Sequence, residues 1–473
     1  MIGRANPAII AIGVTGAEDR TLSELDGPSS LDIEADAPHL VLALEAARPL
    51  TPPFRISLAG VTELSLRRGS ARARRSNGAG RVTAFVPDGL MSARGHALIR
   101  ASGGVFFAED AGSKNGTFRN GERISSAPLA DGDVLETGGS FFLFRRGLSS
   151  ERPPSLPRGE LAKGAPLALS TMSAELERRL SALEAVAPST VPVAISGETG
   201  TGKEVAARAV HEQSGRSGRF QAVNCGAIPA ELVESELFGS RRGAFSGAID
   251  RHGHVRAASG GTLFLDEVSE LPAPAQAALL RVLQEREVVP VGDTRPVPVD
   301  LRVIAASQRP LVDLVREERF RADLYARLAG LEIELLPLRR RLEDLGLIAG
   351  ALLRRAGGAR AEAAGFRRSA ARALFRYSWP WNIRELEQAL ASALALGRGR
   401  PIGLADLPPP LREASDPDRS LSERDRAHKR ALAEALAEGG GNISEAARRL
   451  GKARTQIRRW CRRFDLDPAK FRR

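Results

Sequence analysis

The fold of the centre of this chain is decided by Val193-Ala194-Ile195-Ser196-Gly197-Glu198-Thr199-Gly200-Thr201-Gly202-Lys203. The first four residues are typical of a short buried strand, and a helical pattern follows from Glu204. Between them stands G-x-x-x-x-G-K, in the strand–loop–helix order of a phosphate-binding loop. Glycines let backbone N–H groups surround phosphate oxygens, and a lysine reaches the terminal phosphates. The candidate nucleotide-binding residues are Gly197, Glu198, Thr199, Gly200, Thr201, Gly202, Lys203 and Glu204.

A second acidic element supports a nucleotide site. Residues 262–267 form an apolar run that ends in Asp266 and Glu267. Carboxylates at the carboxyl end of a strand face the ligand crevice of an open α/β sheet. We therefore expect ATP and Mg²⁺ as cofactors, with Asp266 organising the metal and Glu267 polarising the attacking water. The plainer interpretations are a flexible glycine loop and an exposed acidic turn.

The composition fits a protein of about three domains with a basic surplus. Of the 473 residues, 42% are hydrophobic, and 69 Lys+Arg against 57 Asp+Glu give a formal charge of +12, which favours a polyanionic partner. The two cysteines, Cys225 and Cys461, form neither a disulfide framework nor a zinc pattern and are expected to be buried apolar side chains. No apolar run approaches the roughly 20 residues that span a bilayer, so we expect a cytoplasmic protein without a membrane partner.

The hydrophobic pattern and the composition change along the chain, and these changes predict a multidomain architecture. An extension covers 1–37. Short alternating segments predict an all-β domain over 38–146, and a Ser/Pro/Arg-rich linker covers 147–164. Strands alternating with helices predict an α/β subdomain over 165–337, and helical periodicity predicts an all-α lid over 338–400. A proline-rich linker covers 401–420, and a basic all-α domain covers 421–473.

One segment narrows the class of ATPase. Gly243, Ala244, Phe245, Ser246, Gly247 and Ala248 closely resemble the GAFTGA loop of sigma-54-dependent transcription activators, which belong to the AAA+ superfamily. The resemblance implies that this loop contacts sigma-54 and moves with the nucleotide cycle, with Phe245 as an apolar anchor. Ser240 and Arg241 stand where the family usually has His-Glu. The resemblance implies that this replacement affects the coupling between the nucleotide state and the conformation of the loop. A generic Gly/Ala surface loop is the plainer interpretation.

The resemblance extends over residues 168–408, where further motifs follow in the same order as in the family. It implies that Asn224 holds the catalytic glutamate, here Glu267, and that Ser307 and Gln308 form the sensor I position, where Thr-Asn is common. Arg321 and Arg327 resemble the arginine-finger segment, which reaches the γ-phosphate in a neighbouring subunit and makes a ring obligatory. The plainer interpretation of these arginines is a solvated helix face. Residues 379–386 resemble the WPGNVREL signature of the lid, with Arg384 as sensor II and Trp381 in place of glycine.

The predicted all-β domain resembles a forkhead-associated (FHA) domain. Gly112-Ser113-Lys114-Asn115-Gly116-Thr117-Phe118 matches the FHA core signature. FHA domains are β-sandwiches that bind phosphothreonine peptides, and the match implies Arg68, Ser113 and Asn115 as ligand-binding candidates. Arg67 replaces a usual glycine, Ser92 lies one residue farther from His96 than the family spacing, and Arg94 is an alternative phosphate ligand. An FHA fold that binds no phosphopeptide and only packs on the ATPase remains the rival interpretation.

The C-terminal domain resembles the Fis-type helix-turn-helix of the same activators. Asn442 or Ser444 is the expected N-cap of a helix that ends at the turn residue Gly451, and Ile457, Cys461 and Phe464 share an apolar side of the next helix. Residues 442–473 carry 11 Lys/Arg and 3 Asp/Glu, hence 11 − 3 = +8. The expected DNA contacts are Arg454, Thr455, Gln456, Arg458, Arg459 and Arg462. An ordinary basic solvated helix is the alternative.

Taken together, these features predict an ATP-dependent activator of sigma-54 RNA polymerase. We expect it to bind enhancer double-stranded DNA, to sense phosphothreonine on a partner protein or, alternatively, on its own chain, and to assemble as a homo-oligomer, from a dimer to a hexameric ring. One alternative is a DNA-bound phosphopeptide-binding adaptor or repressor with impaired ATPase, which the departures at Arg241, Gln308 and Trp381 favour. Another is an AAA+ remodeller of a different target, which the GAFSGA loop and the Fis-like terminus disfavour.

Overall fold

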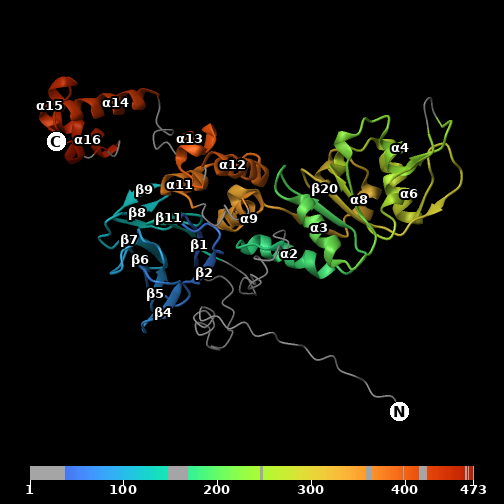
Figure 1. Cartoon of the computed structure of the whole chain (residues 1–473), viewed down its shortest axis with the longest axis horizontal. Helices are drawn as coiled ribbons and strands as arrows, with labels where there is room; N and C mark the ends of the chain where they lie inside the picture. Colours follow the sequence, from blue (N-terminus) through green and yellow to red (C-terminus); the bar gives the residue numbers. More distant parts are fainter. Residues whose placement is uncertain are drawn as a thin grey trace, which may run out of the picture. The chain divides into compact units, whose positions relative to one another are not determined.

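The computed structural model describes residues 38–147, 169–244, 249–357, 365–397, 399–414, 423–463, 466 and 468–471. The chain divides into two compact units, Met1–Pro408 and Pro409–Arg473. None of the helices in the described ranges is long and apolar enough to cross a bilayer. The predicted order of an all-β domain, an α/β ATPase core, a helical lid and a helical terminus is confirmed (Figure 1).

The N-terminal domain is a sandwich of two six-stranded sheets, ordered β2-β1-β12-β11-β8-β9 and β10-β7-β6-β3-β5-β4. Leu40 and Leu42 pair with Phe144 and Phe142 across β1 and β12 and fill the space between the sheets. The strands pair antiparallel except β3 with β5, which are parallel. The strands are β1 His39–Glu45, β2 Phe54–Ser57, β3 Glu63–Arg68, β4 Ala73–Ser76, β5 Arg81–Val86, β6 Ala97–Ser102, β7 Val105–Asp110, β8 Thr117–Arg119, β9 Glu122–Ile124, β10 Ser126–Pro128, β11 Val134–Thr137 and β12 Ser140–Arg145.

The ATPase core is a three-layer α/β domain whose sheet has the parallel order β14-β17-β20-β13-β21. Alternate residues of β17 and β20 face opposite layers. Leu263 and Leu265 meet one set of helices, and Phe264 meets the other. The strands are β13 Val193–Ser196, β14 Phe220–Asn224, β17 Thr262–Asp266, β20 Arg302–Ser307 and β21 Leu331–Glu334. One face carries α2 Ala174–Val186 and α3 Lys203–Gln213, and the other carries α4 Val233–Phe238, α5 His254–Ala257, α6 Ala273–Glu285, α7 Leu311–Arg316 and α8 Ala322–Leu328 (Figure 1).

The lid is built from α9 Leu345–Gly357, α11 Arg368–Arg376 and α12 Asn382–Gly397. The residues expected to form a linker after position 400 contain η6 Leu404–Asp406 and α13 Pro409–Ala414. The short turn η6 is fixed because the carboxylate of Asp406 accepts the N–H of Gly403 at 2.8 Å and binds Arg400 in a bidentate ion pair. Folded structure therefore extends into the segment that we expected to be a linker.

The FHA-like sandwich packs directly on the lid. Gly346 of α9 faces the backbone of Ala43, because a Cβ on Gly346 would lie 1.8 Å from the Ala43 carbonyl oxygen. The N–H of Phe366 donates to the carbonyl of Ala46 at 2.5 Å, and the rings of Phe141 and Phe375 stack with centroids 5.1 Å apart. This contact explains why β1 is apolar on both faces: one covers the sandwich core and the other the lid.

The C-terminal unit contains α14 Glu423–Glu438, α15 Ile443–Arg449, α16 Arg454–Arg463 and η7 Pro468–Phe471. Of the two expected N-caps of α15, Asn442 is the one used: its side chain accepts the N–H of Ser444 at 2.9 Å. Gly451 turns the chain with φ of 62°. Ile457 and Cys461 are buried against α14 and α15, whereas Phe464 lies outside the described residues. Both cysteines of the chain are free and buried, as expected.

Candidate functional site

The phosphate-binding loop joins the end of β13 to the start of α3, as its sequence predicts. Gly197, Gly200 and Gly202 have φ of 148°, 79° and 103°, values that L side chains rarely adopt. The requirement for glycine is strongest at Gly200, where a Cβ would lie 2.3 Å from the carbonyl oxygen of Trp381 in the lid. The loop is therefore shaped jointly by its own glycines and by the lid.

Lys203 is buried, with its ammonium group inside the loop. Its Nζ donates to the carbonyl oxygens of Gly197 at 2.6 Å and Glu198 at 3.2 Å. Burial lowers the pKa of Lys203, while the nearby carboxylates Asp266 and Glu267 raise it. These acidic groups therefore lie close enough to act on the lysine charge, as a shared nucleotide site requires.

Two other polar loop residues are engaged within the chain. Glu204, which replaces the usual Ser/Thr, is exposed and forms an ion pair with Arg208 at 2.7 Å. The hydroxyl of Thr201 donates to the Glu198 carbonyl at 2.8 Å and is almost fully buried. Thr201 thus supports the loop, and Glu204 belongs to the exposed face of α3.

The turn before α12 holds the lid against the loop. The N–H of Ile383 donates to the Gly200 carbonyl at 2.9 Å. The buried Asn382 donates from Nδ2 to the Thr199 carbonyl at 3.0 Å and to the Glu198 carboxylate at 3.1 Å. The Oδ1 atom of Asn382 accepts the N–H of Leu338 at 2.8 Å. One asparagine side chain therefore joins the loop to both the start and the last helix of the lid.

Glu198 adds a charged contact between the phosphate-binding loop and the lid. Arg339 binds its carboxylate in a bidentate ion pair, with Nη1 and Nη2 at 2.7 and 2.5 Å. The hydrogen bonds from Arg339, supported by that from Asn382, lower the pKa of Glu198 to about 2. Sequence reasoning did not predict these two contacts, because Arg339 belongs to no motif and Asn382 stands in the lid signature 379–386 without an assigned role. The sensor II candidate Arg384 is exposed in the first turn of α12, and its Cβ lies 3.1 Å from where a Cβ on Gly200 would stand.

The two predicted catalytic carboxylates lie at the end of β17. The Oδ1 atom of Asp266 accepts the N–H of Glu267 at 3.0 Å, and burial raises the pKa of Asp266 although Lys203 opposes the shift. Glu267 has a left-handed backbone with φ of 53°, a strained conformation that is often found at functional sites. Gln308 donates from Nε2 to Oε1 of Glu267 at 3.4 Å.

Asn224 and Ser307 end the two strands that flank β17. Asn224 pairs with Asp266 in the parallel register, but its Oδ1 accepts the N–H of Ala227 at 3.1 Å. No Asn224–Glu267 hydrogen bond occurs among the described residues, although a Cβ on Gly226 would lie 3.5 Å from Asn224 Oδ1 and 2.5 Å from Glu267 Oε2. Ser307 accepts the N–H of Gly197 with its carbonyl at 3.2 Å and donates its hydroxyl to the Arg309 carbonyl. The side chains thus gather at one sheet edge, with the asparagine used as a cap.

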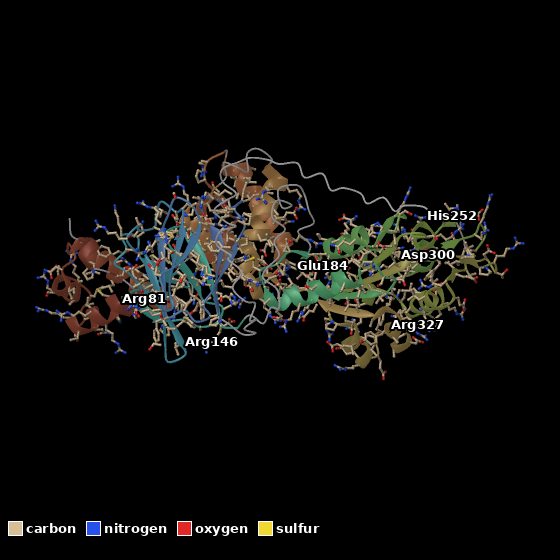
Figure 2. All side chains as sticks on the ribbon, turned by 90° about the horizontal axis from the view of Figure 1, so that it is seen from below. Arg81, Arg146, Glu184, His252, Asp300 and Arg327 are labelled. Atoms are coloured by element: carbon tan, nitrogen blue, oxygen red, sulfur yellow. The ribbon has the colours of Figure 1, made fainter. Side chains whose placement is uncertain are left out.

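The arginine-finger candidates lie on the outside of the domain. Arg327 is exposed on α8 (Figure 2), and Arg321 is exposed just before that helix. Arg321 binds the neighbouring Asp323 through two hydrogen bonds of 3.0 and 2.6 Å. In the ranges that the structure describes, neither arginine has a hydrogen bond or ion pair to residues 197–203. Within the described residues, both arginines thus lie outside the hydrogen-bond network of the phosphate loop.

The loop that resembles GAFTGA rises from a short antiparallel stem formed by β15 Gly239–Ser240 and β16 Arg251–His252. Gly243 and Ala244 are described, whereas Phe245, Ser246, Gly247 and Ala248 lie outside the described residues. Arg241, one of the departures from the family pattern, binds Asp293 at 2.7 Å in the neighbouring turn and lies 3.6 Å from Asp250. The substituted arginine thus fastens the base of this loop to the turn 290–293.

The FHA ligand candidates occupy adjacent loops at one end of the sandwich. The side chain of Arg68 is exposed at the end of β3, and its backbone N–H donates to the Ser92 carbonyl at 3.0 Å. Asn115 donates from Nδ2 to the Leu90 carbonyl at 2.7 Å, so the two loops are tied together. Ser113 is nearly buried and donates its hydroxyl to Asp110 at 2.6 Å. Burial raises the pKa of Asp110, but the hydrogen bonds from Ser113 and Thr117 outweigh this and lower it.

The DNA-contact candidates share one surface of the C-terminal unit. Arg454, Thr455, Gln456, Arg458 and Arg459 are exposed on α16, while the side chain of Arg462 lies outside the described residues. Cys461 and Ile457 turn the opposite side of the helix into the core. The basic side chains are therefore available at the surface, as a helix that enters a DNA groove requires.

Comparison with known families agrees with this geometry. Residues 169–334 match the sigma-54 interaction domain, and residues 339–424 match the AAA+ ATPase lid domain. Residues 78–138 match the FHA domain, and residues 428–467 match a helix-turn-helix domain. The four matches follow the order in which the structure places the four folded parts.

Curated relatives are transcriptional regulators. The chain is 44% identical to ZraR of Klebsiella oxytoca over 286 residues, which cover 59% of this chain and 65% of that protein. It is 40% identical to GlrR of Escherichia coli K12 over 308 residues, which cover 64% of this chain and 69% of that protein. The chain therefore spans about two thirds of the length of these relatives. Among solved structures it is similar to NtrX of Brucella abortus in complex with ATP, with 30% identity, a TM-score of 0.47, and coverage of 65% of this chain and 72% of that one.

The motifs, the order of the domains and the extent of the identity agree. The chain belongs to the family of sigma-54-dependent transcriptional regulators, with an FHA domain before its AAA+ core and a helix-turn-helix domain after it.

Proposed function

We propose that this regulator hydrolyses ATP between subunits and uses the energy to remodel sigma-54 RNA polymerase bound at a promoter. The observation that carries the proposal is the gathering of Lys203, Asp266 and Glu267 at the carboxyl edge of one parallel sheet, beneath a lid that is hydrogen-bonded to the phosphate loop. Ligands of open α/β sheets bind at this edge. This arrangement supports a site that holds phosphates with Lys203, supplies two carboxylates and is covered by the lid.

Each residue has a role that its position supports. Lys203 neutralises the terminal phosphates, and Glu267 orients the attacking water while Gln308 holds its Oε1 atom. Mg²⁺ suits the site because it is commonly held by one or two carboxylates together with substrate phosphates and water. Asp266 would hold it, and the metal would neutralise charge on the phosphate oxygens. Arg384 reports the state of the phosphates to the lid.

Completion of the site requires a second copy of the chain. Arg327 is exposed and has no acidic partner among the described residues, which suits a cation delivered to the γ-phosphate of a neighbouring subunit. Arg321 can join it only after it leaves Asp323, and that exposed ion pair is cheap to break. A ring, up to a hexamer, places one such arginine pair at every seam.

The remaining surfaces contact sigma-54, bind DNA and receive the regulatory phosphothreonine. The loop 243–248 delivers the motion to sigma-54, with Phe245 as its apolar contact. The exposed side chains of α16 bind enhancer DNA, and the FHA domain receives a phosphothreonine through Arg68 and Asn115. Ser113 contacts the phosphate only after its hydroxyl leaves Asp110. Its main role in the unbound domain is to support the loop.

The decisive experiment is transcription from a sigma-54 promoter with purified components. Full-length protein with ATP is expected to open the promoter, whereas the protein with a non-hydrolysable ATP analogue, or with Glu267→Gln, is not. Phe245→Ala is expected to retain ATPase activity but to lose transcription. Retained transcription by Phe245→Ala would point to a different remodelling target, and activity without hydrolysis would contradict the whole proposal.

A DNA-bound adaptor or repressor with impaired ATPase is the second candidate. Two observations favour it: Arg321 is bound to Asp323, and the bulky Trp381 takes the place of a family glycine beside the phosphate loop, with its side chain exposed. A steady-state ATPase assay over a range of protein concentrations separates the two. Turnover that rises with assembly and disappears in Glu267→Gln supports the activator, and negligible turnover in both supports the adaptor.

A further inference from the structure

A strongly basic strip runs along one edge of the FHA sandwich. Residues 67–81 contain six arginines and no acidic residue. They cover the end of β3, the whole of β4 and the start of β5, and β4 is the outer strand of its sheet. We call Arg68, Arg74, Arg75 and Arg81 the arginine strip; all four are exposed, and Arg81 is labelled in Figure 2.

The arginine strip is not neutralised within the fold. Other arginines of the same sandwich are paired: Arg100 with Glu63 and Glu109, and Arg72 with Glu45. For the members of the arginine strip, no carboxylate lies within ion-pair distance in the described part of the chain. Charged side chains on an edge strand protect it from pairing with another chain, but this role does not require a cluster of one sign. An unpaired cluster of one sign repels itself and attracts a polyanion.

The arginine strip begins at the proposed phosphothreonine site. Arg68 stands beside Val86 of β5 in the parallel register, and Arg74 stands beside Ala84 on the other side of the same strand. These two arginines therefore flank β5 and lie two positions apart along it. A peptide whose phosphate binds Arg68 can therefore place its acidic side chains against the other arginines of the arginine strip.

The sequence itself contains a segment of matching charge. Residues 18–36, outside the described residues, have seven Asp/Glu and one Arg, hence 1 − 7 = −6, against +6 for residues 67–81. This segment leads directly into β1, which begins at His39. Residues 1–37 contain two threonines, Thr15 and Thr21, and only Thr21 stands within the acidic run, followed by Glu24 and Asp26.

We propose that residues 18–36 bind the arginine strip of their own chain, and that phosphorylated Thr21 is the phosphothreonine that Arg68 and Asn115 receive. The Thr21 part rests on the proposed phosphothreonine function of the FHA domain. A Ser/Thr kinase would transfer the γ-phosphoryl group of ATP to Oγ1 of Thr21, releasing ADP and the hydroxyl proton. The product adds about −1.5 to −2 charge at neutral pH and three acceptor oxygens.

The residues between Thr21 and Pro38 form a tether that is long enough to reach the arginine strip and short enough to keep Thr21 at a high local concentration. The 38 − 21 = 17 residues from Thr21 to Pro38 span at most roughly 55–60 Å when extended. A domain of about 110 residues has a radius of gyration of about 13 Å, so the segment reaches any part of the sandwich. A short tether gives an effective concentration on the order of millimolar. Phosphopeptides of other proteins must therefore compete with the chain's own segment.

The test compares the full chain with a variant that lacks residues 1–36. The probe is a fluorescent peptide of residues 15–36 with phosphothreonine at position 21, and the readout is its dissociation constant at two salt concentrations. The shortened chain is expected to bind the probe at least about tenfold more tightly than the full chain phosphorylated at Thr21. Arg74→Glu with Arg75→Glu in the shortened chain is expected to weaken binding about tenfold and to reduce its salt dependence. Arg100→Gln, an exposed but paired arginine of the same sheet, is the matched control and is expected to bind like the parent.

Three results would overturn the inference or part of it. Equal probe affinity of the full and shortened chains, or unchanged affinity in the Arg74→Glu, Arg75→Glu variant with normal circular dichroism, excludes docking on the arginine strip. Loss of DNA affinity in that variant with unchanged probe binding assigns the strip to nucleic acid instead. If the phosphate adds nothing to probe binding while the unphosphorylated peptide still competes, the phosphothreonine function fails and the docking of the acidic segment stands.

Discussion

Replacing Glu136 by glutamine tests whether the FHA domain is fastened to the lid by a charge cluster. Glu136 lies on β11 with 2% of its side chain exposed. Its carboxylate binds Arg368 and Arg372 of α11, the latter at 2.7 and 2.8 Å. Both guanidinium groups also lie over the ring of Phe118, at 4.5 and 4.8 Å from its centroid. Two cations of the lid therefore depend on one anion of the sandwich.

The size of the effect follows from burial. Removing one partner of a fully buried ion pair costs about 3–5 kcal/mol, because the other charge is left without compensation. The two arginines keep 24% and 26% of their side-chain exposure, so water recovers part of this cost. We therefore expect Glu136→Gln to lower the free energy of unfolding by about 2–3 kcal/mol. The control is Glu109→Gln, which removes a half-buried partner of the exposed Arg100 and is expected to cost at most about 1 kcal/mol.

Equilibrium unfolding in urea measures this difference. The buried indole of Trp379 in the lid reports the loss of lid packing by fluorescence, and circular dichroism follows the whole chain. The expected result is a lower midpoint for Glu136→Gln with an early loss of the Trp379 signal. If Glu136→Gln costs no more than Glu109→Gln, the cluster does not fasten the two parts and the reasoning fails.

Three further predictions concern the nucleotide site and the FHA loops. Glu267→Gln is expected to reduce steady-state ATP hydrolysis by about 10²–10⁴ while nucleotide binding, measured by equilibrium titration, is retained. Arg327→Ala is expected to reduce hydrolysis by about 10³ or more, and mixing it with Glu267→Gln should restore some activity, because mixed rings contain intact seams. Burial lowers the pKa of His96 below 6.5, so the unfolded chain binds a proton first as the pH falls. FHA stability, measured by thermal unfolding, should therefore drop as the pH falls below about 6.5, and less so in His96→Gln.

The parts of the site that the sequence predicted are those fixed by local pattern. The glycines of loop 197–203 and the carboxylates that follow β17 belong to short segments, and the parallel sheet alone brings the two segments to one edge. The N-cap Asn442 was one of two choices, because a side-chain oxygen at either position has the right chemistry. Local geometry, in which Asn442 accepts the Ser444 N–H, decided between them.

The parts that the sequence did not predict depend on contacts between distant segments. Nothing near Asn382 or Arg339 indicates that both bind Glu198, more than 140 positions earlier. Gly346 reads as an ordinary helical glycine until β1 is placed against it, where its missing side chain admits the Ala43 carbonyl. The resemblance implies that Asn224 holds Glu267, but the structure shows its Oδ1 atom accepting the N–H of Ala227, three residues later, a cap that the motif alone does not indicate.

The lid receives contacts from both the nucleotide site and the FHA domain over a short stretch of chain. Phe375 stacks on the FHA residue Phe141, and the carbonyl of Trp381 touches the phosphate loop only six residues later. Between them, Trp379 donates from Nε1 to the Leu374 carbonyl at 2.9 Å, which ties the turn to the end of α11. A ligand of the FHA domain that shifts α11 is expected to change nucleotide affinity through this stretch, and by linkage the nucleotide must then change the affinity of that ligand by the same factor. Equal factors in the two titrations, lost together in Glu136→Gln, are the expected signature, and two independent affinities would show that the sandwich only rests on the lid.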